Sequence, residues 1–140
     1  MDIRPLDASD RAAAVALWHA AGLTRPWNPP EADFDRAVAG PTSAVLGCRE
    51  GDRLLATAMV GHDGHRGWVY YLAVDSDRRG TGLGRAMMSA AEAWVRAAGI
   101  PKIQLMVRSS NAAATSFYDA LGYGAEDTTV LSRWLEGGPA

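Results

Sequence analysis

The sequence predicts an α/β domain in which a mixed, mostly antiparallel sheet carries helices on both faces. Three observations predict it: strand-like and helix-like segments alternate along the chain, glycine-containing turns join neighbouring apolar strands, and a strand–turn–helix unit occupies residues 68–98. Turn-linked strands pair antiparallel, whereas a strand that follows a crossover helix pairs parallel. The 140 residues are enough for one domain, 1–140, with a substantial core.

The first half of the chain is predicted to form a strand, two helices and a hairpin. We expect a strand at Met1–Pro5, a helix from about Asp10 to Ala21 capped by Asp7 or Ser9, a loop at Arg25–Pro30 and a helix at Glu31–Val38. Strands are expected at Ser43–Arg49 and Leu54–Val60, joined through Gly51-Asp52.

The second half is predicted to add three strands and two helices. A turn at Asp63-Gly64 leads to a strand at Trp68–Val74, and a helix from Leu83 to about Ala98 has one apolar face. A strand at Ile103–Val107, a helix at Ala112–Leu121 closed by Gly122 and a last strand at Thr129–Trp134 complete the order.

The turn at Arg78–Arg85 is the most informative segment, because glycines alternate there with other residues at the start of a helix. Glycines let a ligand approach the backbone closely, and the helix N-terminus and the arginines attract negative charge. The pattern therefore predicts a cradle for a phosphate-bearing ligand.

This glycine-rich turn has three other interpretations. A P-loop needs Lys and Ser/Thr after its last glycine, but Arg85 and Ala86 follow here. The dinucleotide fingerprint needs a different glycine spacing and a later carboxylate, which Lys102–Arg108 does not contain. A tight strand-to-helix turn without a ligand stays open.

Two motifs in this chain resemble those of the GNAT N-acetyltransferases. Arg79–Gly84 fits the R/Q-x-x-G-x-G/A pyrophosphate signature, and Asn111–Tyr118 with Ala120–Tyr123 is similar to the second cofactor element of that superfamily. Arg108–Ala114 resembles the ribosomal-protein alanine N-acetyltransferases, and Arg25–Asn28 and Asp63–Gly67 resemble the small bacterial YpeA-type members. The resemblance extends over nearly the whole chain.

The resemblance implies the GNAT fold, with a central pair of parallel strands that splay apart, and acetyl-CoA as the acyl donor. It implies main-chain contacts to the pantetheine arm from Leu72, Ala73 and Val74. The pyrophosphate would be held by Arg79, Gly80, Thr81, Gly82, Leu83, Gly84 and Arg85. Arg78 would reach the ribose phosphate or only solvent.

The resemblance also implies roles for two residues of the second motif. Tyr118 would be the general acid, since a neutral phenol can protonate the departing thiolate. Asn111 would orient the cofactor or only cap its helix. The implied activity is direct transfer of an acetyl group to a primary amine; the alternative is a non-catalytic module that binds acyl-CoA as a sensor or interaction partner.

The general base of the relatives is missing. The alanine N-acetyltransferases have a glutamate five residues before the asparagine, where this chain has Met106. Without a base, a lysine amine costs roughly 4.6 kcal/mol to deprotonate at pH 7 and an α-amine about 1.4 kcal/mol. We therefore predict a weakly basic acceptor such as an α-amine. Candidate replacement bases are Glu31, Asp63 and His65, and Tyr70 or Tyr71 could relay a proton through water. The segment 63–67 is also compatible with a plain exposed turn.

The composition of the chain restricts which ligands and partners it can bind and where it is located. A net charge of −2 argues against a nucleic-acid-binding surface, and the single cysteine, Cys48, excludes an internal disulfide. No signal peptide and no apolar run of 18 residues are present, so we expect a cytoplasmic protein that does not enter the membrane. The three histidines have no metal-site spacing. The expected partner is a small-molecule or peptide amine, bound by a monomer or homodimer; the loop residues Arg25 and Trp27 are candidates to contact it.

Overall fold

The computed structural model describes residues 2–139, and the chain forms two compact units, Met1–Leu105 and Met106–Ala140. The first unit contains a five-stranded sheet of order β1-β2-β3-β4-β5. Its strands are β1 (Ile3–Pro5), β2 (Ser43–Glu50), β3 (Arg53–His62), β4 (Gly67–Val74) and β5 (Ile103–Leu105). The first four strands pair antiparallel, and β5 pairs parallel with β4. The predicted fold class, a mixed and mostly antiparallel sheet in an α/β fold, is confirmed.

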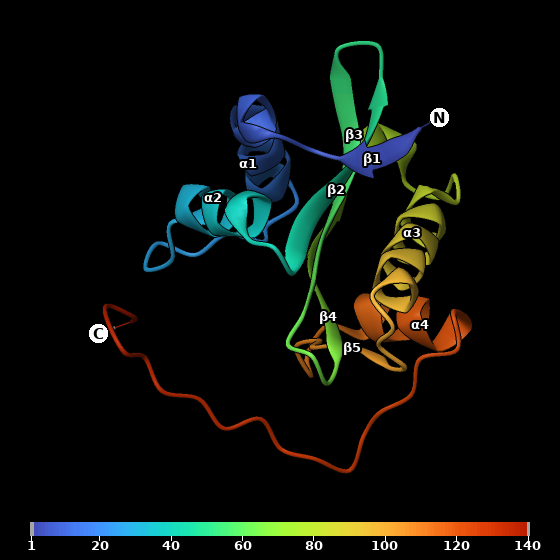
Figure 1. Ribbon diagram of the computed structural model, residues 1–140. Helices are drawn as coiled ribbons and strands as arrows, with labels where there is room; N and C mark the ends of the chain where they lie inside the picture. Colours follow the sequence, from blue (N-terminus) through green and yellow to red (C-terminus); the bar gives the residue numbers. More distant parts are fainter. Residues whose placement is uncertain (1, 140) are drawn as a thin grey trace. The chain divides into compact units, whose positions relative to one another are not determined.

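Helices cover both faces of this sheet (Figure 1). The helices α1 (Arg11–Ala20) and α2 (Pro30–Ala39) lie on one face, and α3 (Leu83–Ala97) lies on the other. Short 3-10 helices, η1 (Ala8–Asp10) and η2 (Ser76–Arg78), precede α1 and α3. The predicted helices and strands of this unit are therefore present, with boundaries shifted by one or two residues.

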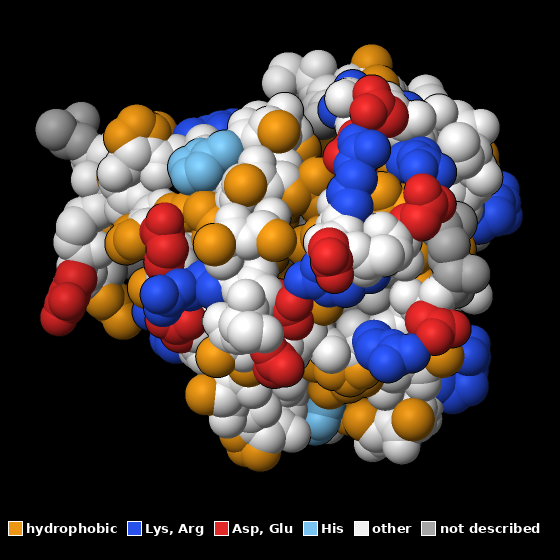
Figure 2. Space-filling model, turned by 90° about the horizontal axis from the view of Figure 1, so that it is seen from above, with side chains coloured by type: hydrophobic (Ala, Val, Ile, Leu, Met, Phe, Trp, Pro, Cys, Tyr) orange, Lys and Arg blue, Asp and Glu red, His pale blue; other side chains and the backbone are white. Residues whose placement is uncertain are grey.

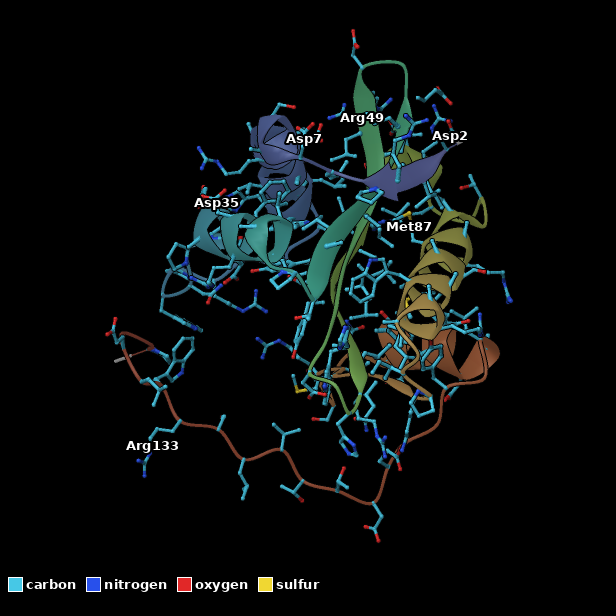
Figure 3. The ribbon with its side chains drawn as sticks, in the orientation of Figure 1. Asp2, Asp7, Asp35, Arg49, Met87 and Arg133 are labelled. Carbon is cyan, nitrogen blue, oxygen red and sulfur yellow. The ribbon has the colours of Figure 1, made fainter. Side chains whose placement is uncertain are left out.

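Each face of the sheet has its own apolar layer. Trp18, Phe34 and Val45 are fully buried in the layer under α1 and α2. On the opposite face, Met87 lies between α3 and the sheet (Figure 3). Gly67 lets α3 come close to β4, because a Cβ at this position would lie 2.6 Å from the side chain of Val95.

The predicted cap lies at the start of η1, the 3-10 helix before α1, whereas the N-cap of α1 is Asp10, which makes no side-chain cap hydrogen bond. The Asp7 carboxylate accepts a hydrogen bond from the backbone N–H of Ser9 at 2.9 Å, and Asp10 accepts one from the backbone N–H of Asp7 at 2.9 Å. This reciprocal capping box satisfies N–H groups that a helix start leaves unpaired. Gly22, with φ +73°, follows the helix end.

The second unit contains the helix α4 (Ala112–Ala120), and one prediction about this unit is wrong. Thr129–Trp134 does not form a strand: it has no β-pairing, and Val130 and Leu131 are 65% and 91% exposed. The apolar residues gave the segment strand character, but a strand forms only where a partner edge accepts its hydrogen bonds. Among residues 2–139, β5 therefore stays at the edge of the sheet, so the parallel pair is not central.

Candidate active site

The glycine-rich turn leads directly into α3. Gly80 and Gly82 have φ values of +75° and +85°, a region that residues with side chains rarely adopt. Gly82 is the N-cap residue of α3, and no side chain caps this helix start among the described residues. The first N–H groups of a helix have no partner within the helix. The turn thus presents backbone donors at the positive end of a helix, which is the arrangement that binds phosphate groups.

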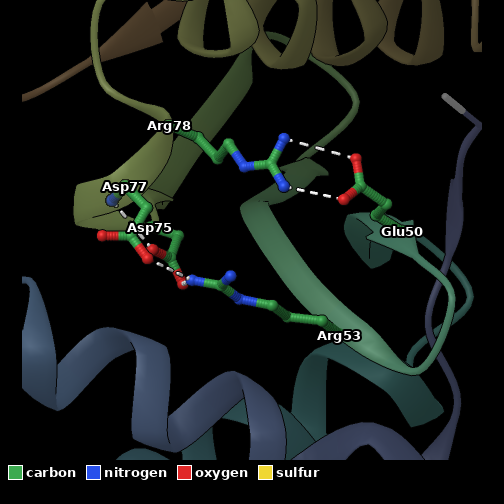
Figure 4. A network of polar contacts seen from close by, with 5 residues as sticks. All are labelled: Glu50, Arg53, Asp75, Asp77 and Arg78. Carbon is green, nitrogen blue, oxygen red and sulfur yellow. Dashed lines mark hydrogen bonds and ion pairs between the residues drawn. The ribbon is translucent and has the colours of Figure 1, made fainter.

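The charged side chains around this turn form two groups. Arg78 pairs with Glu50 through contacts of 2.7 and 3.3 Å, and Arg53 contacts Asp75 at 2.8 Å and Asp77 at 2.9 Å (Figure 4). These contacts, together with hydrogen bonds from the backbone, hold the pKa of Asp75 below its usual range; the backbone N–H of Asp77 has the largest effect. Arg78 thus has an ion-pair partner of its own.

Arg79 and Arg85 differ from Arg78. Both are exposed, and neither forms an ion pair with the residues that the structure describes. Thr81 is also exposed, and its hydroxyl donates a hydrogen bond to the carbonyl oxygen of Arg78. Leu83, in contrast, is 3% exposed and anchors the helix start in the core.

The parallel pairing of β4 and β5 ends well before β4 does. Their parallel pairing covers Gly67 to Val69 on β4 and ends at the pair Val69–Leu105, whereas β4 continues to Val74. Ala73 and Val74 pair with β3 on the other side, and Leu72 has no Cα partner in either strand. Among residues 2–139, one edge of β4 beyond Val69 therefore pairs with no other strand, and its backbone groups need another hydrogen-bonding partner.

A β-bulge in the β3–β4 pairing lies just beyond the last β4–β5 pair. Thr57 pairs with Ala73 and Met59 pairs with Tyr70, so β4 has one residue more than β3 between these two pairs. Tyr71 is in this bulge, and it is the one non-glycine residue with a positive φ, +52°, in residues 2–139. A bulky residue held in this region costs about 1–3 kcal/mol, so contacts of its side chain must compensate.

The candidate bases differ in what surrounds them. Asp63 accepts hydrogen bonds from the backbone N–H groups of His65 and Arg66 at 2.9 and 2.8 Å. These bonds hold the pKa of Asp63 below its usual range, so this carboxylate is a weak base in an exposed turn. Tyr71 is also no base, because burial, and then the hydrogen bond to Asp33, raise the pKa of its phenol far above the ordinary value. Glu31 and His65 are exposed.

The loop residues predicted near the acceptor have local partners. The guanidinium of Arg25 donates to the carbonyl oxygens of Gly22 and Thr24 at 3.1 and 2.7 Å, which stabilises the loop itself. Trp27 is 40% exposed. Asn28 contacts Asp33 and Tyr71, a link that the sequence analysis did not predict.

In the second unit, Asn111 is the N-cap of α4: its Oδ1 accepts a hydrogen bond from the backbone N–H of Ala114 at 3.0 Å. Its cofactor contact stays a prediction. Tyr118 lies within 5.0 Å of Phe117 and 5.8 Å of Tyr123, measured between ring centroids. Burial raises the pKa of the Tyr118 phenol, which therefore keeps its proton at neutral pH. Met106 is 51% exposed.

Residues 2–139 show no metal site, no membrane-spanning helix and, on the face seen in Figure 2, no surface patch of one charge sign. No group of three or more His, Cys, Asp or Glu side chains is arranged to hold a metal ion there. None of the described helices combines the length and apolar character needed to cross a membrane. On the face seen in Figure 2, acidic and basic side chains are intermingled and do not gather into a patch of one sign.

Comparison with known proteins identifies the class. The chain is 38% identical over 135 residues to an acetyltransferase of Yersinia enterocolitica, and the match covers 96% of both chains. It is 28% identical to the ribosomal-protein-S18-alanine N-acetyltransferase from Escherichia coli, covering 86% of this chain and 76% of that chain, with a TM-score of 0.74. AAC(6′)-Iy, solved with the bisubstrate analogue CoA-S-monomethyl-acetylneamine, shares the fold with a TM-score of 0.81 and 14% identity, covering 95% of this chain and 97% of that chain.

The fold and the comparisons define an acetyl-CoA-dependent acetyltransferase. The model of the acetyltransferase (GNAT) family matches residues 12–123, which is most of the chain. The chain therefore belongs to the GNAT acetyltransferase family, and the resemblance inferred from the two motifs is confirmed.

Proposed function

We propose that this enzyme transfers the acetyl group of acetyl-CoA directly to a primary amine, and that the acceptor is an α-amine or another weakly basic amine. The observation that carries the proposal is the junction of β4 and α3. An uncapped, glycine-rich helix start follows a strand whose one edge has no partner beyond Val69. These two features suit the diphosphate and the amide-containing arm of one extended molecule.

The proposed contacts to acetyl-CoA follow the charges and backbone groups of this junction. The backbone of Gly80, Thr81, Gly82, Leu83 and Gly84 would bind the diphosphate with the guanidinium groups of Arg79 and Arg85. Leu72, Ala73 and Val74 would provide main-chain hydrogen bonds to the pantetheine arm. The open space at Gly80 and Gly82 supports this proposal, since no protein atom lies within 4 Å of a Cβ built there.

Tyr118 is proposed as the general acid and Asn111 as a cofactor contact, both by their match to the second GNAT motif. The raised pKa of Tyr118 supports its role, because a phenol that stays neutral has a proton to give to the thiolate of the product. The family model extends over both compact units, which supports one catalytic domain over residues 1–140. The single cysteine, Cys48, is a buried free thiol, which suits a reducing compartment. We therefore propose that the enzyme is cytoplasmic.

The acceptor class follows from the missing base. Met106 cannot take a proton, so the enzyme favours an amine that is partly neutral at physiological pH. The Escherichia coli relative is named for an alanine of ribosomal protein S18, and AAC(6′)-Iy was solved with an acetylneamine analogue. Both names are compatible with an amine acceptor, and the α-amine proposal rests on Met106 alone.

The experiment compares α-amines and ε-amines in matched pairs: a dipeptide with a free N-terminus and an Nα-blocked lysine, each with acetyl-CoA. Release of the CoA thiol and the mass of the product are measured. We expect faster turnover of the α-amine at pH 7; faster turnover of the blocked lysine would contradict the acceptor class. Binding of acetyl-CoA without turnover of any amine would indicate the non-catalytic alternative.

A pair of arginine variants tests the diphosphate site. Arg79 and Arg96 are both exposed, but Arg96 is in the last turn of α3, at the opposite end of the helix. We expect Arg79→Ala to raise the Kd for acetyl-CoA about tenfold and Arg96→Ala to leave it unchanged. Equal effects of the two substitutions would refute the assignment of Arg79.

A further inference from the structure

The left-handed backbone of Tyr71 is held by contacts from both sides. Its ring stacks on that of Trp18, with centroids 3.9 Å apart and planes 9° from parallel. Its carbonyl oxygen accepts a hydrogen bond from the Thr57 hydroxyl at 2.9 Å, and the Trp18 indole N–H donates to the same hydroxyl at 2.9 Å. Trp18 and Thr57 are fully buried, so their contacts hold one side of Tyr71 rigidly.

The hydroxyl of Tyr71 is fixed by α2. It donates a hydrogen bond to Oδ2 of Asp33 at 2.7 Å. Asn28, in the loop before α2, donates to the same Oδ2 at 2.7 Å and lies 3.3 Å from the tyrosine hydroxyl. Arg36 pairs with the other oxygen, Oδ1, at 2.6 Å. The carboxylate of Asp33 thus accepts hydrogen bonds from Tyr71, Asn28 and Arg36.

These contacts connect three parts of the chain that are far apart in the sequence. Asp33 and Tyr71 are 38 positions apart, and the Asn28 loop is the segment that the sequence analysis placed next to the acceptor. The bulge in turn lies two residues after the last β4–β5 pair, where β4 loses its partner. A change in the Tyr71 backbone would therefore re-aim the N–H groups of Tyr71 and Leu72.

We infer that Asp33 is a positioning residue for acetyl transfer: through the Tyr71 hydroxyl it fixes the bulge of β4, and through Asn28 it ties the loop of residues 25–30 to that bulge. The inference rests on the proposed function. Asp33 is in the α2 helix and lies outside both GNAT motifs. Both oxygens of this carboxylate already accept hydrogen bonds from within the protein, so its role is to orient Tyr71.

The test measures kcat and KM for both substrates in four single variants and one double variant. Tyr71→Phe keeps the stacked ring but loses the bond to Asp33, and Asp33→Ala removes the same bond from the other side. We expect each to lower kcat by about 10-fold to 100-fold while the KM for acetyl-CoA changes less than about threefold. Asp33→Asn keeps an acceptor for the phenol and restores most of the rate.

Asp35→Ala is the matched control. Asp35 is also on α2, but it is exposed and pairs with Arg11 at 2.9 Å. We expect the kcat of this variant to equal that of the unsubstituted enzyme. Combining Tyr71→Phe with Asp33→Ala should lower kcat no further than Asp33→Ala alone, since Asp33→Ala already removes the bond to the Tyr71 hydroxyl. Additive losses, or an unchanged kcat in folded Tyr71→Phe, would overturn the inference.

A second readout does not depend on turnover. Amide hydrogen exchange at Tyr71 and Leu72, measured without substrate, should become faster in Tyr71→Phe and Asp33→Ala and stay unchanged in Asp35→Ala. Unchanged exchange in all three variants would refute the inference that Asp33 and Tyr71 hold the bulge of β4. If the unsubstituted protein acetylates no amine but exchange responds as expected, the proposed function is wrong, whereas the role of Asp33 in holding the bulge is supported.

Discussion

Substitution of Gly82 by alanine tests the cofactor turn with a control on the same helix. Gly82 is the N-cap of α3 with φ +85°, and Gly99 follows the end of α3 with φ +79°. No protein atom lies within 4 Å of a Cβ built at either position. Alanine therefore meets the same backbone cost at both ends of the helix, and neither methyl group meets a protein neighbour.

The magnitude follows from the backbone. An L-residue in the left-handed region costs roughly 1–2 kcal/mol, so Gly82→Ala and Gly99→Ala should each lower the free energy of unfolding by about that amount. For a domain of this size the melting temperature falls by about 2–8 °C. Urea unfolding and thermal melts measure both changes, and the two variants should agree within about 0.5 kcal/mol.

Binding separates the two variants. In the proposed site, the methyl group at residue 82 enters the space where backbone N–H groups approach the diphosphate, whereas the methyl group at residue 99 does not. We expect Gly82→Ala to raise the Kd for acetyl-CoA at least about tenfold, equal to about 1.4 kcal/mol, in a calorimetric titration. The Kd of Gly99→Ala should equal that of the unsubstituted enzyme. The same Kd for both variants would refute the assignment of this turn.

Three further predictions concern single side chains. Tyr118→Phe should lower kcat and leave the Kd for acetyl-CoA nearly unchanged. Tyr123→Phe, a change in a ring 5.8 Å away, should leave kcat unchanged. Release of the CoA thiol measures both rates, and a full rate in Tyr118→Phe would show that Tyr118 is not the general acid. Thr57→Val should destabilise the fold by about 1–3 kcal/mol in urea, because the buried Trp18 indole N–H loses its acceptor; a loss under about 0.5 kcal/mol would contradict this. The pKa of Tyr71 is raised in the folded state, so the folded protein keeps a proton that the unfolded chain releases near pH 10. The free energy of unfolding should therefore fall as the pH rises above about 10. Thermal melts of Tyr71→Phe should show a weaker dependence of stability on pH in this range.

The parts of the fold that the sequence predicted depend on local signals. Asp7, Gly22 and Asn111 are caps whose partners lie within a few residues, so residue type and spacing were sufficient to place them. The strand at Thr129–Trp134 failed because strand formation depends on a partner edge, and an apolar pattern does not name that partner.

The parts that could not be predicted depend on long-range register. The bulge at Tyr71 exists because β3 and β4 differ by one residue between two paired positions, and no residue of β4 indicates the shift by its type. The role of Asp33 also arises from contacts with residues 5 and 38 positions away. The signal that could have found it is the strain itself: a tyrosine at a positive φ requires partners, and a search for them leads to the carboxylate.

Arg78 and Arg79 are adjacent in the sequence, but of the two only Arg78 forms an ion pair among the residues that the structure describes. Three carboxylates, Glu50, Asp75 and Asp77, lie beside the segment that leads into the turn and would oppose the binding of a diphosphate. Arg53 and Arg78 pair with them, and these pairs cancel most of that negative charge within one Debye length, about 8 Å at physiological salt. The positive potential of the proposed site then comes from the helix start and from the exposed arginines of the turn. Arg78 contributes by neutralising a carboxylate, and its neighbour in the sequence is left free to contact the ligand.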